Sequence, residues 1–430
     1  MTRYAGLSSD GHRGARHADR FHTDRCVAEL RRAGVDGVVA TSVENVVYLT
    51  GYDHWPLHTF REHGVYAVVT ASGERGLVAP RNAGEYLVTD WPADCTLVTY
   101  GDFFVSVAPG GTMAPLDQQW ASLRESTPHH RTAAEALTAL TNELGLGPHA
   151  TVALDDQALS TAGREGLRER FRRAEGVDAN MLLRRVRRVK TPHEVALLRE
   201  VANRTEKAMN GVFSRVREGI SETEMFDLYR RLALEEGLNP GHCEVNTGLR
   251  ASGCFPPDST SLVGFGDTVR IDCGAQLEGY HSDTGRNATL GTMSARLSIA
   301  EDAIRAGIQA MFDMAGPGVP VAELARTAID SVRKAGLPEY ERHHVGHGIG
   351  LEMYEYPVLS PRTDPSVVLV EGEVLNFELP FYEMGTGGLQ IEDTVLVTSS
   401  GVEVLTTNSR SAFRAGAQGH AAAEGVSREA

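Results

Sequence analysis

Four acidic residues and one histidine stand at positions where they could bind metal ions together. Asp272 and Glu378 each end a segment of alternating apolar residues, and Asp283 and Glu392 each follow a glycine-containing segment shortly afterwards. Carboxylates beside apolar strands are desolvated and repel one another unless a positive partner compensates them. Two divalent cations would balance the four negative charges. The alternative is that these acids are ordinary turn residues.

The histidine is His347, which lies in the glycine-rich segment 343–350. A site of carboxylates and one imidazole suits manganese, cobalt, ferrous iron or zinc better than it suits metals that prefer thiolates. We expect two divalent ions per chain, with Mn²⁺ first and Co²⁺, Fe²⁺ or Zn²⁺ as alternatives.

An internal repeat predicts how the acids come together. Residues 266–272 (GDTVRID) and 372–378 (GEVLNFE) share a glycine, an acid and then apolar positions in the same register, and both end in an acid. Each segment indicates a turn that enters a strand, with apolar residues on one face. Two related halves of one domain would therefore bring the four carboxylates to one place.

The chain as a whole predicts two ordered domains between flexible tails. Residues 21–180 begin with a helical stretch and continue with apolar runs typical of an α/β domain, at 35–40, 46–50, 65–70 and 76–79. Thr191, Pro192 and Glu194 form the start signal of a new helix. We expect the catalytic domain over 184–411 and the flexible tails over 1–20 and 412–430.

Composition and charge exclude several classes of partner. The 430 residues are 41% hydrophobic and 23% charged, and the net charge of −15 repels phosphate backbones and anionic lipid. The basic run 184–190 is therefore expected to be a solvated linker and not a nucleic-acid patch. No apolar run approaches the roughly 18 residues of a membrane span, and residues 1–20 lack the apolar core of a signal peptide. We expect a cytoplasmic protein that binds neither nucleic acid nor membranes.

Five motifs in order resemble the pita-bread metallopeptidases, the family of prolidase, aminopeptidase P, methionine aminopeptidase and creatinase. They lie at 271–274 (IDCG), 280–286 (YHSDTGR), 343–350 (HHVGHGIG), 377–380 (FELP) and 390–394 (QIEDT). Residues 45–52 (NVVYLTGY) are similar to the creatinase-type N-terminal domain. The resemblance implies an α+β pita-bread catalytic domain, preceded by a creatinase-type α/β N-terminal domain, in a homodimer.

The resemblance also implies a dinuclear metal site. Asp272 and Asp283 would hold one ion, His347 and Glu378 the other, and Asp283 and Glu392 would bridge the two. The ions would lower the pKa of a bridging water, and the resulting hydroxide would attack an amide bond. Glu378 would also act as general base and proton shuttle.

Three positions depart from the prolidase and aminopeptidase P pattern. Phe255 and Tyr354 stand where those enzymes carry histidines that contact the substrate, and Gln390 stands where they usually carry arginine. Losing one such hydrogen-bond donor typically costs about 2.7 to 4 kcal/mol of barrier. His343 is retained, so the catalytic candidates are Glu378, His343 and Tyr354. The departures predict a less cationic pocket, poorly matched to the free carboxylate of a dipeptide.

Substrate contacts are expected from Phe255 and Gln390 and from three further residues. His281 precedes Asp283 by two positions, so it either lines the pocket or faces the other side of its strand. His54 and Trp55 belong to the N-terminal domain, which in dimers of the family often reaches the pocket of the other subunit. The alternative is that both are ordinary surface loop residues.

These features favour a dinuclear-metal hydrolase resembling Xaa-Pro dipeptidase or aminopeptidase P, acting on a small peptide or another small amide. One alternative is an enzyme on the same scaffold that hydrolyses a non-peptide C–N bond or eliminates a leaving group, which Phe255 and Tyr354 favour. A binding protein with a vestigial site is the least favoured alternative, because all five ligand residues are present.

Overall fold

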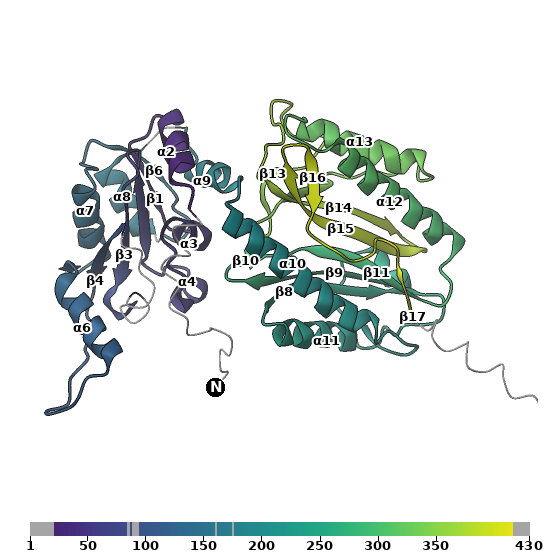
Figure 1. The fold of residues 1–430 in the computed structure, drawn as a ribbon, viewed down its shortest axis with the longest axis horizontal. Coiled ribbons are helices and arrows are strands. Elements are labelled where there is room, and N and C mark those ends of the chain that lie inside the picture. Colours follow the sequence, from purple (N-terminus) through teal and green to yellow (C-terminus); the bar gives the residue numbers. More distant parts are fainter. Residues whose placement is uncertain (1–20, 84–86, 88–93, 160, 174–175, 416–430) are drawn as a thin grey trace, which may run out of the picture. The chain divides into compact units, whose positions relative to one another are not determined.

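The computed structural model describes residues 21–83, 87, 94–159, 161–173 and 176–415, and the chain forms two compact units (Figure 1). The N-terminal unit runs to Arg187 and includes Thr191–His193; the C-terminal unit comprises Arg188–Lys190 and the chain from Glu194 onward. The tail expected at 1–20 lies outside the described residues, as do residues 416–430 of the tail expected at 412–430. Among the described helices, none combines the length and apolar character needed to cross a membrane.

Within the described residues, the N-terminal unit contains a seven-stranded sheet of order β5-β4-β3-β2-β1-β6-β7. The β1–β2 and β2–β3 pairs are antiparallel, and the other pairs are parallel. Leu137 and Leu140 of α7 pack on valines of the central strands. The elements are α2 (Thr23–Arg32), β1 (Gly37–Ala40), α3 (Val43–Thr50), α4 (Trp55–Thr59), β2 (Tyr66–Thr70), β3 (Arg75–Pro80), η1 (Arg81–Ala83), β4 (Cys95–Tyr100), α6 (Pro115–Ser126), β5 (His129–His130), α7 (Ala133–Glu143), β6 (Thr151–Leu154), α8 (Thr161–Arg170), β7 (Arg172–Arg173) and α9 (Ala179–Arg187).

The apolar run 46–50 is helical, whereas the other three runs contain strands β1, β2 and β3. The carboxylate of Asp155 explains the difference, because its Oδ2 accepts hydrogen bonds from the backbone N–H of Ser42 at 2.9 Å and from Asn45 Nδ2 at 2.9 Å. These bonds fix the start of α3. Gly51 ends the helix with a left-handed φ of 71°.

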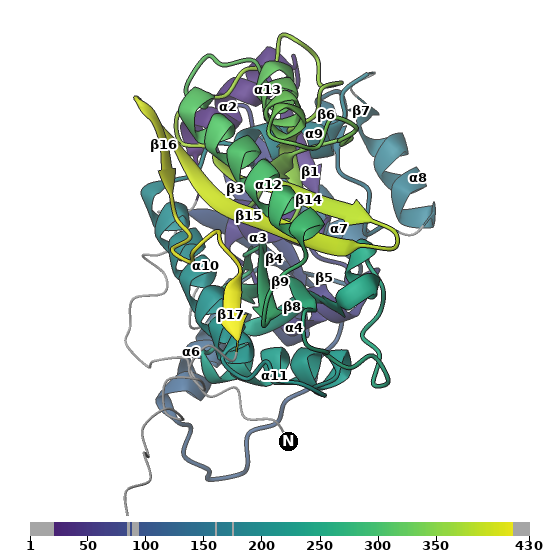
Figure 2. The ribbon, with the colours of Figure 1, turned by 90° about the vertical axis from the view of Figure 1, so that its right-hand side faces the viewer.

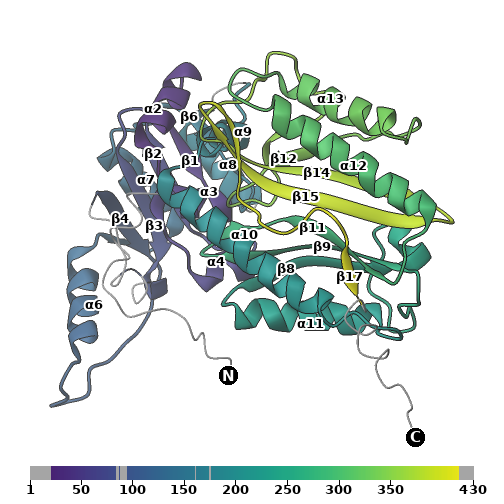
Figure 3. The ribbon, with the colours of Figure 1, turned by 45° about the vertical axis from the view of Figure 1, so that its right-hand side comes forward.

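In residues 188–415, the C-terminal unit repeats the order of two helices followed by a sheet. Helices α10 and α11 pack on the first sheet, and α12 and α13 pack on the second (Figures 2 and 3). The sheets have the orders β10-β9-β11-β17, with β8 also paired to β9, and β13-β12-β14-β15-β16. The elements are α10 (Pro192–Phe213), α11 (Glu222–Glu235), β8 (Asn239–Thr247), η2 (Gly248–Ser252), β9 (Thr268–Leu277), β10 (Tyr280–His281), β11 (Thr284–Leu290), α12 (Ala295–Met314), α13 (Val321–Lys334), β12 (Gly346–Gly348), β13 (Glu355–Val358), β14 (Val374–Glu383), β15 (Gly387–Thr398), β16 (Gly401–Val404) and β17 (Phe413–Ala415).

The repeat found in the sequence is therefore structural. Its two copies form the first parts of β9 and β14, and each of these strands lies in the interior of its sheet. Val269 and Ile271 of β9 enter the core under α10 and α11, as the alternation predicts.

The basic run 184–190 is not a solvated linker, contrary to expectation. Lys190 and Glu355 are each 1% exposed, and Lys190 Nζ lies 2.8 Å from Glu355 Oε2. Arg188 forms an ion pair with the fully buried Glu373. A buried carboxylate is costly without a positive partner. The run therefore supplies cations to the interior of the C-terminal unit.

Residues 413–415 also correct an expectation, because they were assigned to the flexible C-terminal tail. They form β17, which pairs in parallel with β11. The ring of Phe413 stacks on Phe213 with centroids 6.0 Å apart, and Ala415 is buried. A strand of three residues is too short to show periodicity in the sequence.

Candidate metal centre

Strands of both sheets position the five predicted ligand residues. Asp272 lies on β9 and Asp283 directly precedes β11, while His347, Glu378 and Glu392 lie on β12, β14 and β15. Asp272 stands opposite Gly285 in the β9–β11 pair. Glu378 stands directly opposite Glu392 in the β14–β15 pair. Each half of the unit therefore contributes two carboxylates.

Hydrogen bonds between β11 and β15 bring the two halves together. Asn287 Nδ2 donates to the carbonyl of Gln390 at 2.8 Å, and the Gln390 N–H donates to Asn287 Oδ1 at 2.9 Å. Arg286 reaches the carbonyl of Glu392 and binds Asp393 at 2.6 Å. These bonds make one carboxylate-lined centre from two sheets.

His242 of β8 completes the first half of the centre. Its Nε2 lies 3.2 Å from Asp272 Oδ1 and 2.9 Å from Asp283 Oδ1, so the three residues could share one ion. A Cβ on Gly274 would lie 2.5 Å from His242 Cε1, so only glycine leaves room for this ring. The sequence shows His242 in no motif, because only the pairing of β8 with β9 places it here.

The second half is built around His347. Its Nδ1 donates to the carbonyl of Gly348 at 2.9 Å, so Nε2 is the ring nitrogen that faces the carboxylates. That nitrogen lies 3.4 Å from Asp283 Oδ2. His344 Nδ1 lies 2.6 Å from Glu378 Oε1. Asp283 thus faces both halves.

The protonation of the centre reflects burial and crowding of like charges. Burial raises the pKa of Glu392 well above its usual range, and Asp272, Asp283 and Glu378 raise it further. Burial also raises the pKa of Asp272. For Asp283, burial alone would raise the pKa, but the nearby His242 outweighs it and lowers the value. Burial opposes a charge on His242, yet the two aspartates raise its pKa to about 11.

The donor set fits divalent cations. Glu392 Oε2 is buried and has no hydrogen-bond partner within the described part of the chain. Asp283 Oδ1, Glu378 Oε1 and His347 Nε2 are also buried, and their short contacts lack hydrogen-bond geometry. Buried polar atoms are rarely left unsatisfied. Oxygen and imidazole donors that converge in this way are typical of manganese, cobalt, iron or zinc sites.

Two of the departures from the family pattern lie at the centre. The ring of Tyr354 stacks on His347 with centroids 3.7 Å apart, and 44% of the tyrosine is exposed. Burial and the surrounding carboxylates, Glu378 first among them, raise the pKa of Tyr354, so the hydroxyl stays protonated and can donate. Gln390 is buried between Asp272 and Glu392 and donates to both.

Phe255, the third departure from the family pattern, and His281 contact residues other than the five predicted metal ligands. The ring of Phe255 lies under the Arg250 guanidinium, 5.2 Å from ring centroid to carbon. His281 Nε2 lies 2.9 Å from Gln276 Nε2, and burial lowers the pKa of His281. Their contact with substrate stays a prediction.

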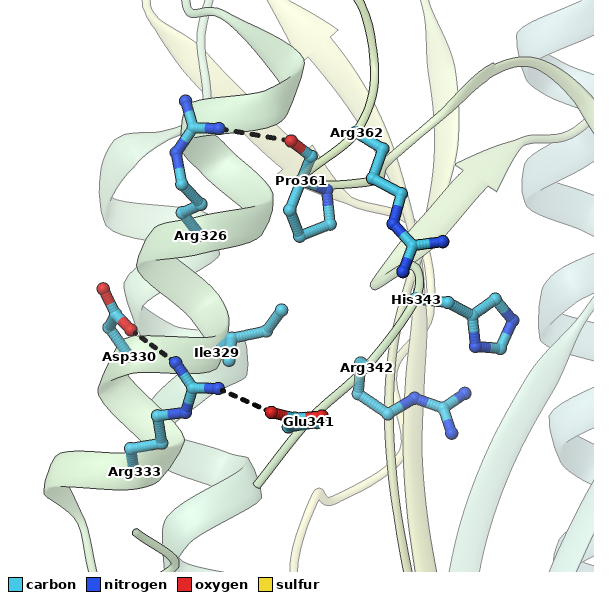
Figure 4. A pocket seen from close by; sticks show the side chains of 9 residues that line it. All are labelled: Arg326, Ile329, Asp330, Arg333, Glu341, Arg342, His343, Pro361 and Arg362. Atoms are coloured by element: carbon cyan, nitrogen blue, oxygen red, sulfur yellow. Dashed lines mark hydrogen bonds and ion pairs between the residues drawn. The ribbon is translucent and has the colours of Figure 1, made fainter. Parts of the chain in front are cut away.

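His343 lines a cleft beside α13 (Figure 4). The cleft has a volume of about 250 Å³ and is lined by Arg326, Ile329, Asp330, Arg333, Glu341, Arg342, His343, Pro361 and Arg362. The rings of His343 and His344 are 4.2 Å apart, so the cleft adjoins the group that contacts Glu378. It is therefore His344, which the sequence did not single out, that reaches the carboxylate.

His54 and Trp55 lie in the N-terminal unit at the start of α4. Their rings make an edge contact at 5.9 Å, and Trp55 is 58% exposed. Their part in substrate recognition stays a prediction.

Known proteins resemble the chain over both units. Residues 196–399 match metallopeptidase family M24, and residues 23–189 match the creatinase/prolidase N-terminal domain. An Xaa-Pro dipeptidase from Lactobacillus helveticus is 31% identical over 60% of this chain and 70% of its own length. An Xaa-Pro dipeptidase from Lactobacillus delbrueckii subsp. lactis is 25% identical over 91% of this chain and 98% of its own.

A solved structure supports the fold. The Xaa-Pro dipeptidase from Bacillus anthracis covers 91% of this chain and 98% of its own with a TM-score of 0.74, at 22% identity. These matches confirm the family suggested by the motifs and the pita-bread domain behind a creatinase-type domain. The chain therefore belongs to metallopeptidase family M24 and is a metal-dependent hydrolase.

Proposed function

We propose that the protein is a dinuclear-metal peptidase that hydrolyses the Xaa-Pro bond of small peptides. The observation that carries the proposal is the convergence of four carboxylates and His347. Buried atoms of Asp283, Glu378, Glu392 and His347 lack hydrogen-bond partners among the described residues. Relatives named Xaa-Pro dipeptidase support the substrate class. We also propose Mn²⁺ as the metal and a homodimer as the assembly.

Each of the five ligand residues has its own role in binding the two ions. Asp272 and Asp283 would hold one ion, His347 and Glu378 the other, and Asp283 and Glu392 both. Bound divalent ions would supply an acidified water and polarise the scissile carbonyl. Glu378 would accept the proton of that water and pass it to the leaving amine. His344, 2.6 Å from Glu378 Oε1, would keep that carboxylate oriented between the two steps.

The cleft beside His343 favours a substrate with a free carboxylate. Arg342 and Arg362 line it and form no ion pair within the described part of the chain, whereas Asp330 and Glu341 both pair with Arg333. Guanidinium groups bind carboxylates with charge-assisted hydrogen bonds. These arginines lie outside the motifs, so the prediction of a less cationic pocket did not consider them.

The test is proline release from Xaa-Pro dipeptides by protein reconstituted with Mn²⁺. We expect turnover above roughly 1 per second, which is ordinary for enzymes. Amidated Xaa-Pro dipeptides should show kcat/KM at least about tenfold lower, since the arginines then lose a charged partner. Xaa-Ala dipeptides serve as the matched control for the proline requirement. Metal bound without release of proline from any Xaa-Pro dipeptide would contradict the proposal.

A second candidate function is the hydrolysis or elimination of a non-peptide C–N bond. Phe255 and Tyr354 favour it, because the peptidases of the family carry histidines at both positions. Metal binding without peptide turnover, followed by turnover of small non-peptide amides, would support this candidate.

Replacing Tyr354 by phenylalanine should lower kcat at least about tenfold if its hydroxyl donates to the reacting carbonyl. The ring contact with His347 at 3.7 Å survives this change, so metal content should stay equal to wild type. Stopped-time proline assays and metal analysis measure the two quantities. Tyr356→Phe, two residues along the same segment, is the matched control. An unchanged rate would remove Tyr354 from the mechanism.

A further inference from the structure

We infer that Gln390 is a positioning residue, whose amide is oriented by Arg270 and Tyr382 and in turn fixes Asp272 and Glu392 for metal binding. The inference deepens the proposed function, because it rests on the same metal centre. The side-chain amide of Gln390 is buried, and it makes four hydrogen bonds: two as donor and two as acceptor.

The nitrogen side of the amide faces the carboxylates. Gln390 Nε2 donates to Asp272 Oδ2 at 2.8 Å and to Glu392 Oε1. Because Asp272 belongs to β9 and Glu392 to β15, one side chain holds a carboxylate from each half. The carboxylate oxygens bound here are fixed, so the opposite oxygens are oriented toward the centre: Asp272 Oδ1 lies 3.2 Å from His242.

The oxygen side of the amide faces two donors. Arg270 donates from a terminal nitrogen to Gln390 Oε1 at 2.9 Å, and the Tyr382 hydroxyl donates to the same oxygen at 3.1 Å. A flipped amide would point oxygen at two carboxylates and N–H groups at two donors. The chemistry of the four neighbours therefore allows one orientation of Gln390.

Arg270 is itself held in place. It is fully buried, and its second terminal nitrogen donates to Glu244 at 3.0 Å, to Asn246 at 2.8 Å and to the carbonyl of Gly253 at 2.9 Å. A guanidinium keeps its charge at every physiological pH. It also lies 3.9 Å from Asp272 Oδ2, so its charge acts on that carboxylate directly, while its hydrogen bond orients the amide of Gln390.

The backbone around Gln390 prevents the side chain from swinging away. Asn287 binds its N–H and its carbonyl. A Cβ on Gly285 would lie 2.7 Å from Gln390 Cγ and 3.0 Å from Glu392 Cγ. The side chain of Gln390 therefore packs directly on the backbone of β11 at Gly285, and this packing restricts the position of its terminal amide.

The test is Co²⁺ binding to metal-free protein, followed by calorimetry and by the visible absorbance of the bound ion. Gln390→Met keeps the size of the side chain and removes all four hydrogen bonds. We expect Co²⁺ to bind about 10- to 100-fold more weakly, as is usual when a partner that orients ligands is lost. Gln309→Met is the matched control, since Gln309 is exposed on α12 and bonds only Asp313 among the described residues.

A milder variant separates positioning from folding. Tyr382→Phe removes one donor to Gln390 Oε1 and should weaken Co²⁺ binding about two- to tenfold. In Gln390→Met/Tyr382→Phe, binding should be no weaker than in Gln390→Met alone, because Tyr382 acts through Gln390.

Wild-type affinity in Gln390→Met, or additive losses in the double variant, would overturn the inference. If Gln390→Met does not fold, wild-type affinity in Tyr382→Phe overturns it. Failure of the peptidase proposal is distinguishable, because it appears as wild-type protein that binds Co²⁺ and releases no proline.

Discussion

Asp283→Asn should lower turnover by more than about 100-fold and reduce the amount of bound metal. Asp283 Oδ1 faces His242 at 2.9 Å and Asp283 Oδ2 faces His347 at 3.4 Å, so its carboxylate serves both halves of the centre. An amide offers one acceptor oxygen and no charge. Loss of a residue that merely orients a ligand already costs about 10- to 100-fold in affinity or activity, so loss of the bridging ligand should cost more.

Metal analysis after reconstitution and the proline assay measure both effects of this change. Asp302→Asn on α12 is the matched control, since Asp302 is exposed and pairs only with Arg305 among the described residues. Full activity in Asp283→Asn would contradict the assignment of these residues as the metal centre.

Glu392→Gln should have effects of opposite sign on stability and on activity. Burial and three neighbouring carboxylates raise the pKa of Glu392, so its ionised form destabilises the folded metal-free protein at neutral pH. Glutamine has the same shape without the charge, and the free energy of unfolding without metal should rise by about 1 kcal/mol, the scale of a removed charge conflict. With Mn²⁺ the variant should lose more than about 100-fold in turnover, because a bridging carboxylate is gone.

Denaturant unfolding in the presence of a chelator measures the first effect, and the proline assay measures the second. Glu403→Gln on the neighbouring strand β16 is the control, since Glu403 is half-exposed and should change neither quantity by much. A metal-free variant that is clearly less stable than wild type would show that Glu392 is not strained by its neighbours.

The sequence predicted the parts of the fold that depend on local pattern. Thr191, Pro192 and Glu194 predicted the start of a helix, and α10 begins at Pro192 with Glu194 in its first turn. The repeat ending in Asp272 and Glu378 predicted two related strands, because an alternating pattern and its last residue are both local features.

The parts that depend on pairing distant segments were missed. His242 and Asp272 meet because β8 pairs with β9, and no pattern in either segment specifies the partner. Arg270 occupies an alternating position that could equally face solvent, yet it is fully buried beside Gln390. His343 and His344 are equivalent in a motif, and only the backbone direction decides which one reaches Glu378.

The buried cations at 188–190 have a consequence for dividing the protein into fragments. Arg188 and Lys190 precede the long helix α10 in sequence, yet they neutralise Glu373 and Glu355 inside the catalytic unit. A truncation that began at Glu194 would remove the cations that pair with both carboxylates. Breaking a buried ion pair costs about 3 to 5 kcal/mol. Two such losses approach the whole stability of a typical domain, about 5 to 15 kcal/mol. A fragment that keeps both buried ion pairs of the catalytic unit must therefore begin at Arg188 or before it.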